Sequence, residues 1–345
     1  MEKVERVEKV ESVKRNPSIE LLRCLAMGLI VGYHCFAYGE FSGSHAAWTA
    51  MFTTLICWHV DTFLAISGWF GIKFSWMKVA KLGGLILFYN ALDWAFGGRS
   101  VGGGWFGNNY LLLMLLAPLL NWALEKMSAR QTWTVWSIFA AGMVAWWLPW
   151  HEKDPMWWVM GGYSIVNFVF IYFTVRGLRR LRGGEGVALP WVGVGVFGGM
   201  FALFAGIDLV SRLTGHGHLS GIGAVFSSYD APHVWIFAIC LVAFFVQRVR
   251  IPEWLGKVAT FCAPSMFGIY LLHDTTSFGH EIFRIPERWL AAHTALHPAI
   301  IVILAAVWTF VFCLAVDLVR REVLRRLRGL RRKAKGQGEG EQRCW

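Results

Sequence analysis

Residues 19–38 read Ile-Glu-Leu-Leu-Arg-Cys-Leu-Ala-Met-Gly-Leu-Ile-Val-Gly-Tyr-His-Cys-Phe-Ala-Tyr. This run is apolar and long enough to cross a bilayer as a helix, which takes about 20 residues. It nevertheless contains Arg23 and His34. A charged side chain at membrane depth costs roughly 2.5–3.5 kcal/mol on insertion scales, so such residues usually face the protein interior and mark a function.

The spacing of Arg23 and His34 predicts that both side chains lie on one face of this helix. Eleven positions at about 100° each leave only about 20° after whole turns, and at about 1.5 Å per residue the two lie roughly 16 Å apart along the axis. One face therefore presents a permanent cation near one membrane surface and a titratable imidazole toward the other.

The composition of the whole chain is that of an integral membrane protein. Of the 345 residues 56% are hydrophobic, 20 are Trp, and the mean hydropathy is +0.47. Soluble domains have about 45–50% apolar residues even when Gly is counted, and Gly is not included in the 56%. The seven Cys are scattered, and their spacing predicts neither a disulfide framework nor a metal site.

The hydropathy pattern predicts an all-α protein, a polytopic membrane helix bundle of about ten transmembrane helices. Residues 1–18 are expected to be a charged cytoplasmic N-terminal segment, residues 19–319 the membrane domain, and residues 320–345 a basic cytoplasmic tail. In that tail we expect an amphipathic helix on the inner leaflet, followed by disorder from residue 331. The predicted spans are 19–38, 48–70, 79–97, 105–124, 132–150, 157–175, 189–211, 232–249, 259–276 and 298–319.

The basic residues alternate between the two sides of this predicted topology. Segments on the side of the N-terminus hold 27 of the 33 Lys and Arg residues, and segments on the other side hold 5. Because cytoplasmic loops carry the excess of Lys and Arg, both termini are predicted to lie in the cytoplasm. The net charge of +11 is then a feature of topology and does not predict a nucleic-acid partner.

Polar residues inside the predicted spans form two groups that are candidates for a site. His34, Asp93, His273 and Asp274 lie toward the outer ends of their spans, whereas Glu20, Arg23 and Ser67 lie deeper or nearer the cytoplasm. An imidazole with an ordinary pKa near 6.5 can accept a hydroxyl proton, and a carboxylate can orient it. The alternative is that these groups pair only to hold helices together.

Six stretches, in order and spacing, cover residues 19–276. They are Ile19–Leu22 followed by Arg23-x10-His34, Phe63–Phe70 (FLAISGWF), the basic turn Trp76–Lys81, Trp105-Phe106 with Tyr110–Asn121, Ser228–Pro232, and Phe267–Asp274 (FGIYLLHD). Together they resemble the acyltransferase-3 family of bacterial membrane O-acyltransferases. The likeness is nearest to its branch of surface-glycan O-acetyltransferases, which has Ile-Glu-Leu-Leu-Arg at the first of these stretches.

The resemblance implies transfer of an acyl group, usually acetyl, from cytosolic acyl-CoA to a hydroxyl of an extracytoplasmic or lipid-linked glycan. Acetyl-CoA would be the co-substrate, the bilayer and a glycan or glycolipid the partners, and the bacterial cytoplasmic membrane the location. The implied catalytic residues are His34 and Arg23, with Arg23 at the acyl-CoA end. Acceptor-side or supporting roles are expected for His273, Asp274, Asp93, Glu20, Ser67 and Tyr110. Arg23, Lys78 and Lys81 are expected to bind the cofactor, and the two lysines stand where many members have arginines.

Two other functions fit parts of the sequence. A transporter or exporter of a small carboxylate or glycan intermediate would also use an interior Arg and a polar pathway across the membrane. A structural assembly subunit would need neither Arg23 nor His34. The acceptor, the acyl chain, direct transfer as against an acyl-enzyme intermediate, and the oligomeric state stay open.

Overall fold

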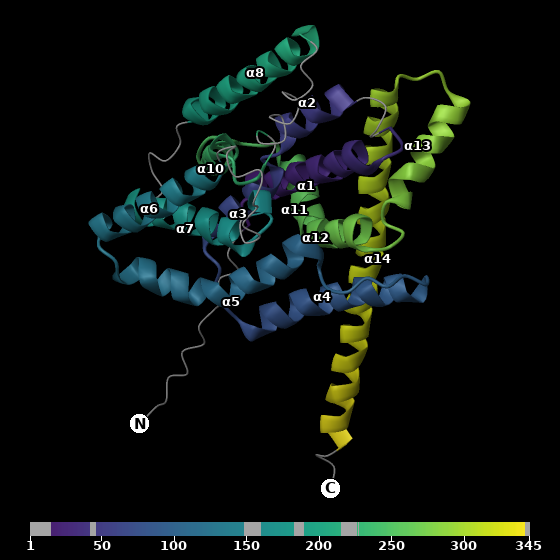
Figure 1. The fold of residues 1–345 in the computed structure, drawn as a ribbon. Coiled ribbons are helices and arrows are strands. Elements are labelled where there is room, and N and C mark those ends of the chain that lie inside the picture. Colours follow the sequence, from purple (N-terminus) through teal and green to yellow (C-terminus); the bar gives the residue numbers. More distant parts are fainter. Residues whose placement is uncertain are drawn as a thin grey trace.

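The structure is a computed structural model that describes residues 15–41, 46–147, 160–182, 190–214, 226 and 228–341. Within these ranges the chain forms helices and connecting turns and contains no β-strand (Figure 1). The main helices are α1 (Pro17–Tyr38), α2 (Ala46–Ile56), α3 (His59–Phe70), α4 (Trp76–Ala95), α5 (Gly104–Lys126), α6 (Ala129–Trp147), α7 (Ile165–Arg182), α8 (Pro190–Thr214), α10 (Pro232–Gln247), α11 (Glu253–Cys262), α12 (Met266–Tyr270), α13 (Glu281–His293) and α14 (Pro298–Glu341).

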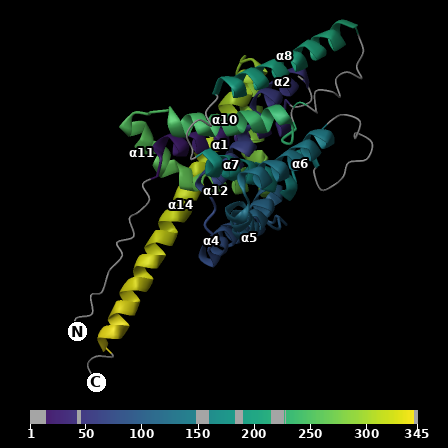
Figure 2. The ribbon, with the colours of Figure 1, turned by 90° about the vertical axis from the view of Figure 1, so that its left-hand side faces the viewer.

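Helix α1 is the centre around which the others pack. It begins where the side chain of Asn16 accepts hydrogen bonds from the backbone N–H groups of Ser18 and Ile19, and Pro17 occupies its first turn. It contacts α2, α3, α10, α11, α12 and α14, and both ribbon views show it inside the bundle (Figures 1 and 2). Residues 19–38, which form most of α1, therefore lie where side chains from many helices can meet.

The helices bear out an integral membrane protein. Among the described residues, five helical stretches are long and apolar enough to span a membrane: Pro17–Tyr38, Met51–Phe70, Pro190–Val210, Glu253–Thr275 and Pro298–Leu330. Helix α10 is apolar but shorter. Helices α4 to α7 overlap predicted spans but are not both long and apolar enough to be counted with these five. The number of about ten transmembrane helices therefore stays a prediction. Parts of three predicted spans, namely 148–150, 157–159 and residue 189, lie outside the described residues, as do residues 1–14 and 342–345.

The stretch Glu253–Thr275 is not one regular helix. Helix α11 ends at Cys262, a 3-10 turn η4 (Ala263–Ser265) follows, and α12 runs into a π-helical turn η5 (Leu271–Thr275). The Pro264 ring removes a backbone donor at the first interruption. Single π-helical turns occur frequently at functional sites, and this one carries His273 and Asp274.

Helix α14 continues through residues 319 and 320, where we expected the last span to end and a separate tail to begin. The helix also includes residues 331–341, for which we expected disorder. The chain offers a reason, because no Pro interrupts it and Glu322 pairs with Arg325 and Arg326 at helical spacing. In both ribbon views the C-terminal part of α14 extends beyond the rest of the bundle (Figures 1 and 2).

Candidate active site

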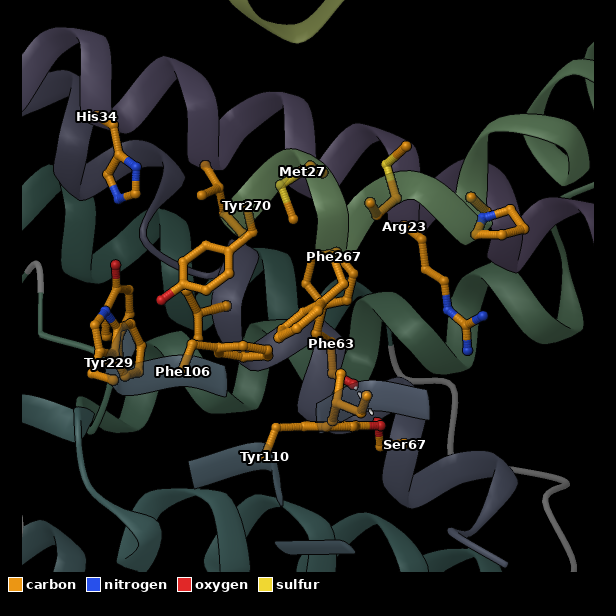
Figure 3. Close-up of a pocket in the computed structure, with 17 residues that line it drawn as sticks. Arg23, Met27, His34, Phe63, Ser67, Phe106, Tyr110, Tyr229, Phe267 and Tyr270 are labelled. Carbon is orange, nitrogen blue, oxygen red and sulfur yellow. Dashed lines mark hydrogen bonds between the residues drawn. The ribbon is translucent and has the colours of Figure 1, made fainter. Parts of the chain in front are cut away.

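A cavity of about 260 Å³ lies beside α1, between that helix and residues of α3, α4, α5, η4 and α12 (Figure 3). Its walls are mostly apolar and aromatic, with a few polar groups, as is usual for small-molecule sites. The polar side chains that line it are Arg23, His34, Ser67, Tyr110, Tyr229 and Tyr270, together with the indole of Trp105.

One wall of the cavity is a single stripe of α1. Arg23, Met27, Ile30 and His34 all line it, and their spacing of four, three and four residues is that of one helix face. Arg23 and His34 lie at opposite ends of the cavity, with Met27 between them (Figure 3). The prediction that Arg23 and His34 share one helix face is thus confirmed, and both side chains line the same cavity.

At one end, His34 meets the π-helical turn η5. His34 Nδ1 lies 2.9 Å from His273 Nε2 and 3.4 Å from Asp274 Oδ1. The other ring nitrogen of His273, Nδ1, lies 2.7 Å from the backbone oxygen of Ile269. These residues come from chain positions 239 apart, so only the tertiary fold brings the two histidines together.

These contacts assign the tautomers of both histidines. His273 Nδ1 must carry a proton because its partner is a carbonyl oxygen, which only accepts, and in the neutral ring Nε2 is then an acceptor. His34 Nδ1 faces that acceptor and a carboxylate oxygen, so it carries the proton and donates. The lone pair of His34 is therefore on Nε2, the form that a general base needs.

At the other end, Arg23 is held by a buried carboxylate. Arg23 Nη1 donates to both carboxylate oxygens of Glu20, at 3.2 and 3.3 Å, while 33% of the Arg23 side chain stays exposed. Figure 3 shows Ser67 and Tyr110 below Phe63, nearer to Arg23 than to His34, and their hydroxyl oxygens are 2.9 Å apart. This end can pair with an anionic or carbonyl group through charge and hydroxyl hydrogen bonds.

The aromatic lining was not among the residues singled out from the sequence. Phe63, Trp105, Phe106, Phe267 and Tyr270 form the space between the two polar ends. All of them lie within the sequence motifs that resemble the family. The sequence alone does not predict that their side chains point into one cavity. Figure 3 shows the Tyr270 hydroxyl directed toward the His34 end, which also holds Tyr229.

Asp93, expected on the acceptor side, does not line the cavity. Its carboxylate accepts four hydrogen bonds, from the backbone N–H and hydroxyl of Ser100 and of Ser277. Asp93 thereby ties the end of α4 to the segment just after η5, four residues from His273. These hydrogen bonds hold the chain that follows the turn with His273 and Asp274 against α4.

Lys78 and Lys81, expected at the CoA end, are exposed on the first turns of α4 and do not line the cavity. Leu82, one turn beyond Lys78 on the same face, does line it. Lys78 Nζ donates to the backbone oxygen of Lys73 at 3.0 Å. Both lysines therefore lie near the outside of the cavity wall, where they can meet only the part of a ligand that leaves the cavity.

A family model described as an acyltransferase domain matches residues 16–318. The chain belongs to the acyltransferase-3 family. The matched residues include both polar ends of the cavity and every residue that lines it. No curated protein and no solved structure matched this acyltransferase.

Proposed function

We propose that this membrane acyltransferase moves an acetyl group from cytosolic acetyl-CoA to a hydroxyl of an extracytoplasmic or lipid-linked glycan. The observation that carries the proposal is the His34–His273 contact of 2.9 Å at one end of a cavity that has Arg23 at the other. The two ends supply a base for the acceptor and a cation for the donor, with an apolar passage between them.

In the proposed reaction, His34 Nε2 accepts the proton of the acceptor hydroxyl while its oxygen attacks the thioester carbonyl carbon. The C–S bond then breaks, and the proton passes from His34 to the departing thiolate, which gives an ester and free CoA. His273 and Asp274 keep the proton of His34 on Nδ1 and stabilise the imidazolium while it exists. General-base help of this kind is worth about 10²–10⁴ in rate.

The cavity size limits how the donor can bind. Pockets that enclose drug-sized ligands have about 300–1,000 Å³. The cavity of about 260 Å³ can thus accept the thioester end of acyl-CoA but not the whole donor. Arg23 belongs to the end that the distribution of basic residues assigns to the cytoplasm, so the donor would enter there and leave its nucleotide outside.

The test is release of free CoA by purified protein in nanodiscs, with acetyl-CoA and a glycan fraction from the host surface. We expect His34→Ala to reduce the rate at least 100-fold, since it removes the general base. His293→Ala, which removes an exposed histidine of α13, is the matched control and should keep the parental rate. Parental CoA release by His34→Ala would overturn the assignment, and transport of substrate without any CoA release would favour a carrier.

Retention of label distinguishes direct transfer from an acyl-His34 intermediate. Protein incubated with radiolabelled acetyl-CoA, and no acceptor, is denatured and washed. Direct transfer predicts that no label stays on the chain. Label that depends on His34 would instead show that this residue carries the acyl group.

A further inference from the structure

A second hollow lies on the surface of the bundle, outside the cavity described above. It is an open groove of about 710 Å³, lined by Phe261 of α11 and by seven residues of α14. Four of the lining residues are arginines and one is acidic: Arg320, Arg321, Arg325, Arg328 and Glu322. The groove is thus strongly basic on its α14 wall.

Three of these arginines form a row along one face of α14. Arg321, Arg325 and Arg328 follow one another at four and three residues, so at about 100° per residue they share a face and span roughly 10 Å along the axis. Arg321 Nη1 donates to the backbone oxygen of Phe261 at 3.0 Å and to Ser265 Oγ at 2.9 Å. This anchors the row against α11 and η4.

The charges in the groove are only partly balanced by protein carboxylates. Arg320 pairs with buried Asp317 at 2.8 Å, and Arg325 shares Glu322 with Arg326. Among the described residues no carboxylate pairs with Arg321 or Arg328. A surplus of positive charge with free N–H donors therefore faces the groove, as a phosphate ligand would require.

The turn η4 lies between the cavity and the Arg321 side chain of the groove. The turn η4 contributes Ala263 and Pro264 to the cavity wall, while the next residue, Ser265, binds Arg321. On the other side of this segment, Cys24 Sγ lies 3.8 Å from the backbone oxygen of Ala259. Helices α1 and α14 thus both contact the segment formed by α11 and η4.

We propose that the row Arg321, Arg325 and Arg328 binds the phosphate groups of the donor nucleotide while its thioester reaches into the cavity. This inference rests on the proposed function, since it names the site of the half of acyl-CoA that the cavity cannot hold. An excess of cytoplasmic arginines follows from topology alone. Topology explains neither their spacing on one face nor the anchoring of Arg321 beside the cavity wall.

The test measures binding of CoA and of 3′-dephospho-CoA to the full chain in phosphatidylcholine nanodiscs by calorimetry. We expect the double variant Arg325→Gln/Arg328→Gln to weaken CoA binding about tenfold or more. The loss should be smaller for 3′-dephospho-CoA, because one phosphate is already missing. Arg326→Gln is the matched control, since Arg326 also pairs with Glu322 but does not line the groove. It should leave both dissociation constants unchanged.

The outcomes separate this inference from the proposed function. A wild-type chain that binds no CoA would overturn both. Wild-type binding that the double variant leaves unchanged would overturn the arginine row alone, and the double variant Lys78→Gln/Lys81→Gln would then be the next to measure. A second set of nanodiscs containing phosphatidylglycerol tests the lipid source. If the double variant weakens only binding of that anionic lipid, the row serves a lipid headgroup and the inference is wrong.

Discussion

At the scale of single residues, the proton on His34 is placed by its neighbours. His34 Nδ1 faces two acceptors, His273 Nε2 and Asp274 Oδ1, and the Ile269 carbonyl in turn fixes His273. A histidine alone exchanges between two neutral tautomers, whereas this arrangement keeps the lone pair on the nitrogen that the reaction needs. His273 should therefore affect catalysis without touching the substrate.

We expect His273→Leu to lower kcat about 10- to 100-fold, because His34 loses the nearer of the two acceptors that orient its ring. The KM for acetyl-CoA should hardly change, since Arg23 and the donor end lie at the other side of the cavity. His273→Gln keeps an acceptor oxygen and should recover part of the loss. Steady-state kinetics of the three proteins check this, and equal kcat values would show that His273 has only a packing role.

At the scale of elements, α13 closes the end of α1 that carries His34. Glu287 is buried, and its Oε2 accepts from the backbone N–H of Glu40 at 2.7 Å. A Cβ atom added at Gly39 would collide with the backbone oxygen of Cys35 and would lie 2.6 Å from the Glu287 carboxylate oxygens, and the backbone contact disfavours any larger residue here. Arg284 donates twice to the backbone oxygen of Tyr38. The last turn of α1 is thereby clamped about one turn beyond His34.

This clamp predicts a stability that falls as the pH rises. Burial, with the charge of Glu40 adding to it, raises the pKa of Glu287 from 4.5 to about 7. Because the folded pKa lies above the unfolded one, the stabilisation is present at low pH and is lost as the pH rises toward 7 and above. Between pH 6 and 8 the loss is about 1 kcal/mol. Thermal unfolding should show a falling midpoint for the wild type and a flatter profile for Glu287→Gln.

Helix α12, which supplies Phe267 and Tyr270 to the cavity, is held in place by a close contact with α14. Asp317 accepts from Tyr89 Oη at 2.9 Å and from Arg320 Nε at 2.8 Å. A Cβ atom added at Gly268 would collide with the Asp317 carboxylate, which these two hydrogen bonds hold in place, so only glycine allows this approach. The positions of Phe267 and Tyr270 in the cavity wall therefore depend on glycine at residue 268.

We expect Gly268→Ala to destabilise the protein by about 1–3 kcal/mol, the usual cost of overpacking, and to lower kcat/KM by moving Phe267 and Tyr270. Gly84→Ala is the control, because a Cβ there meets nothing within 4 Å. Both substitutions replace a helical glycine with alanine, so any general gain in helix propensity cancels in the comparison. Unfolding midpoints and kinetics that match for the two variants would contradict the role given to this contact.

At the scale of the whole molecule, local geometry was predictable and tertiary contacts were not. The shared face of Arg23 and His34 follows from their spacing alone, because it depends only on helix geometry. The contact of His34 with His273 depends on how distant helices rotate against each other. Asp93 shows the same limit: its position near a span end was readable, but its engagement by Ser100 and Ser277 was not. The π-helical turn of η5 likewise has no pattern in the sequence that predicts it.

The direction of the proposed transfer depends on one remaining property of the whole molecule, namely which end faces the cytoplasm. The basic segments predict that the α14 arginine row is cytoplasmic and that the loop before α14 is outside. Single cysteines at two exposed positions, Gly329→Cys on α14 and Thr294→Cys after α13, test this in a background with Cys344→Ser. A membrane-impermeant thiol reagent should label Thr294→Cys in intact cells and Gly329→Cys only after permeabilisation. The reverse pattern would place Arg23 outside, and cytosolic acyl-CoA could then not be the donor.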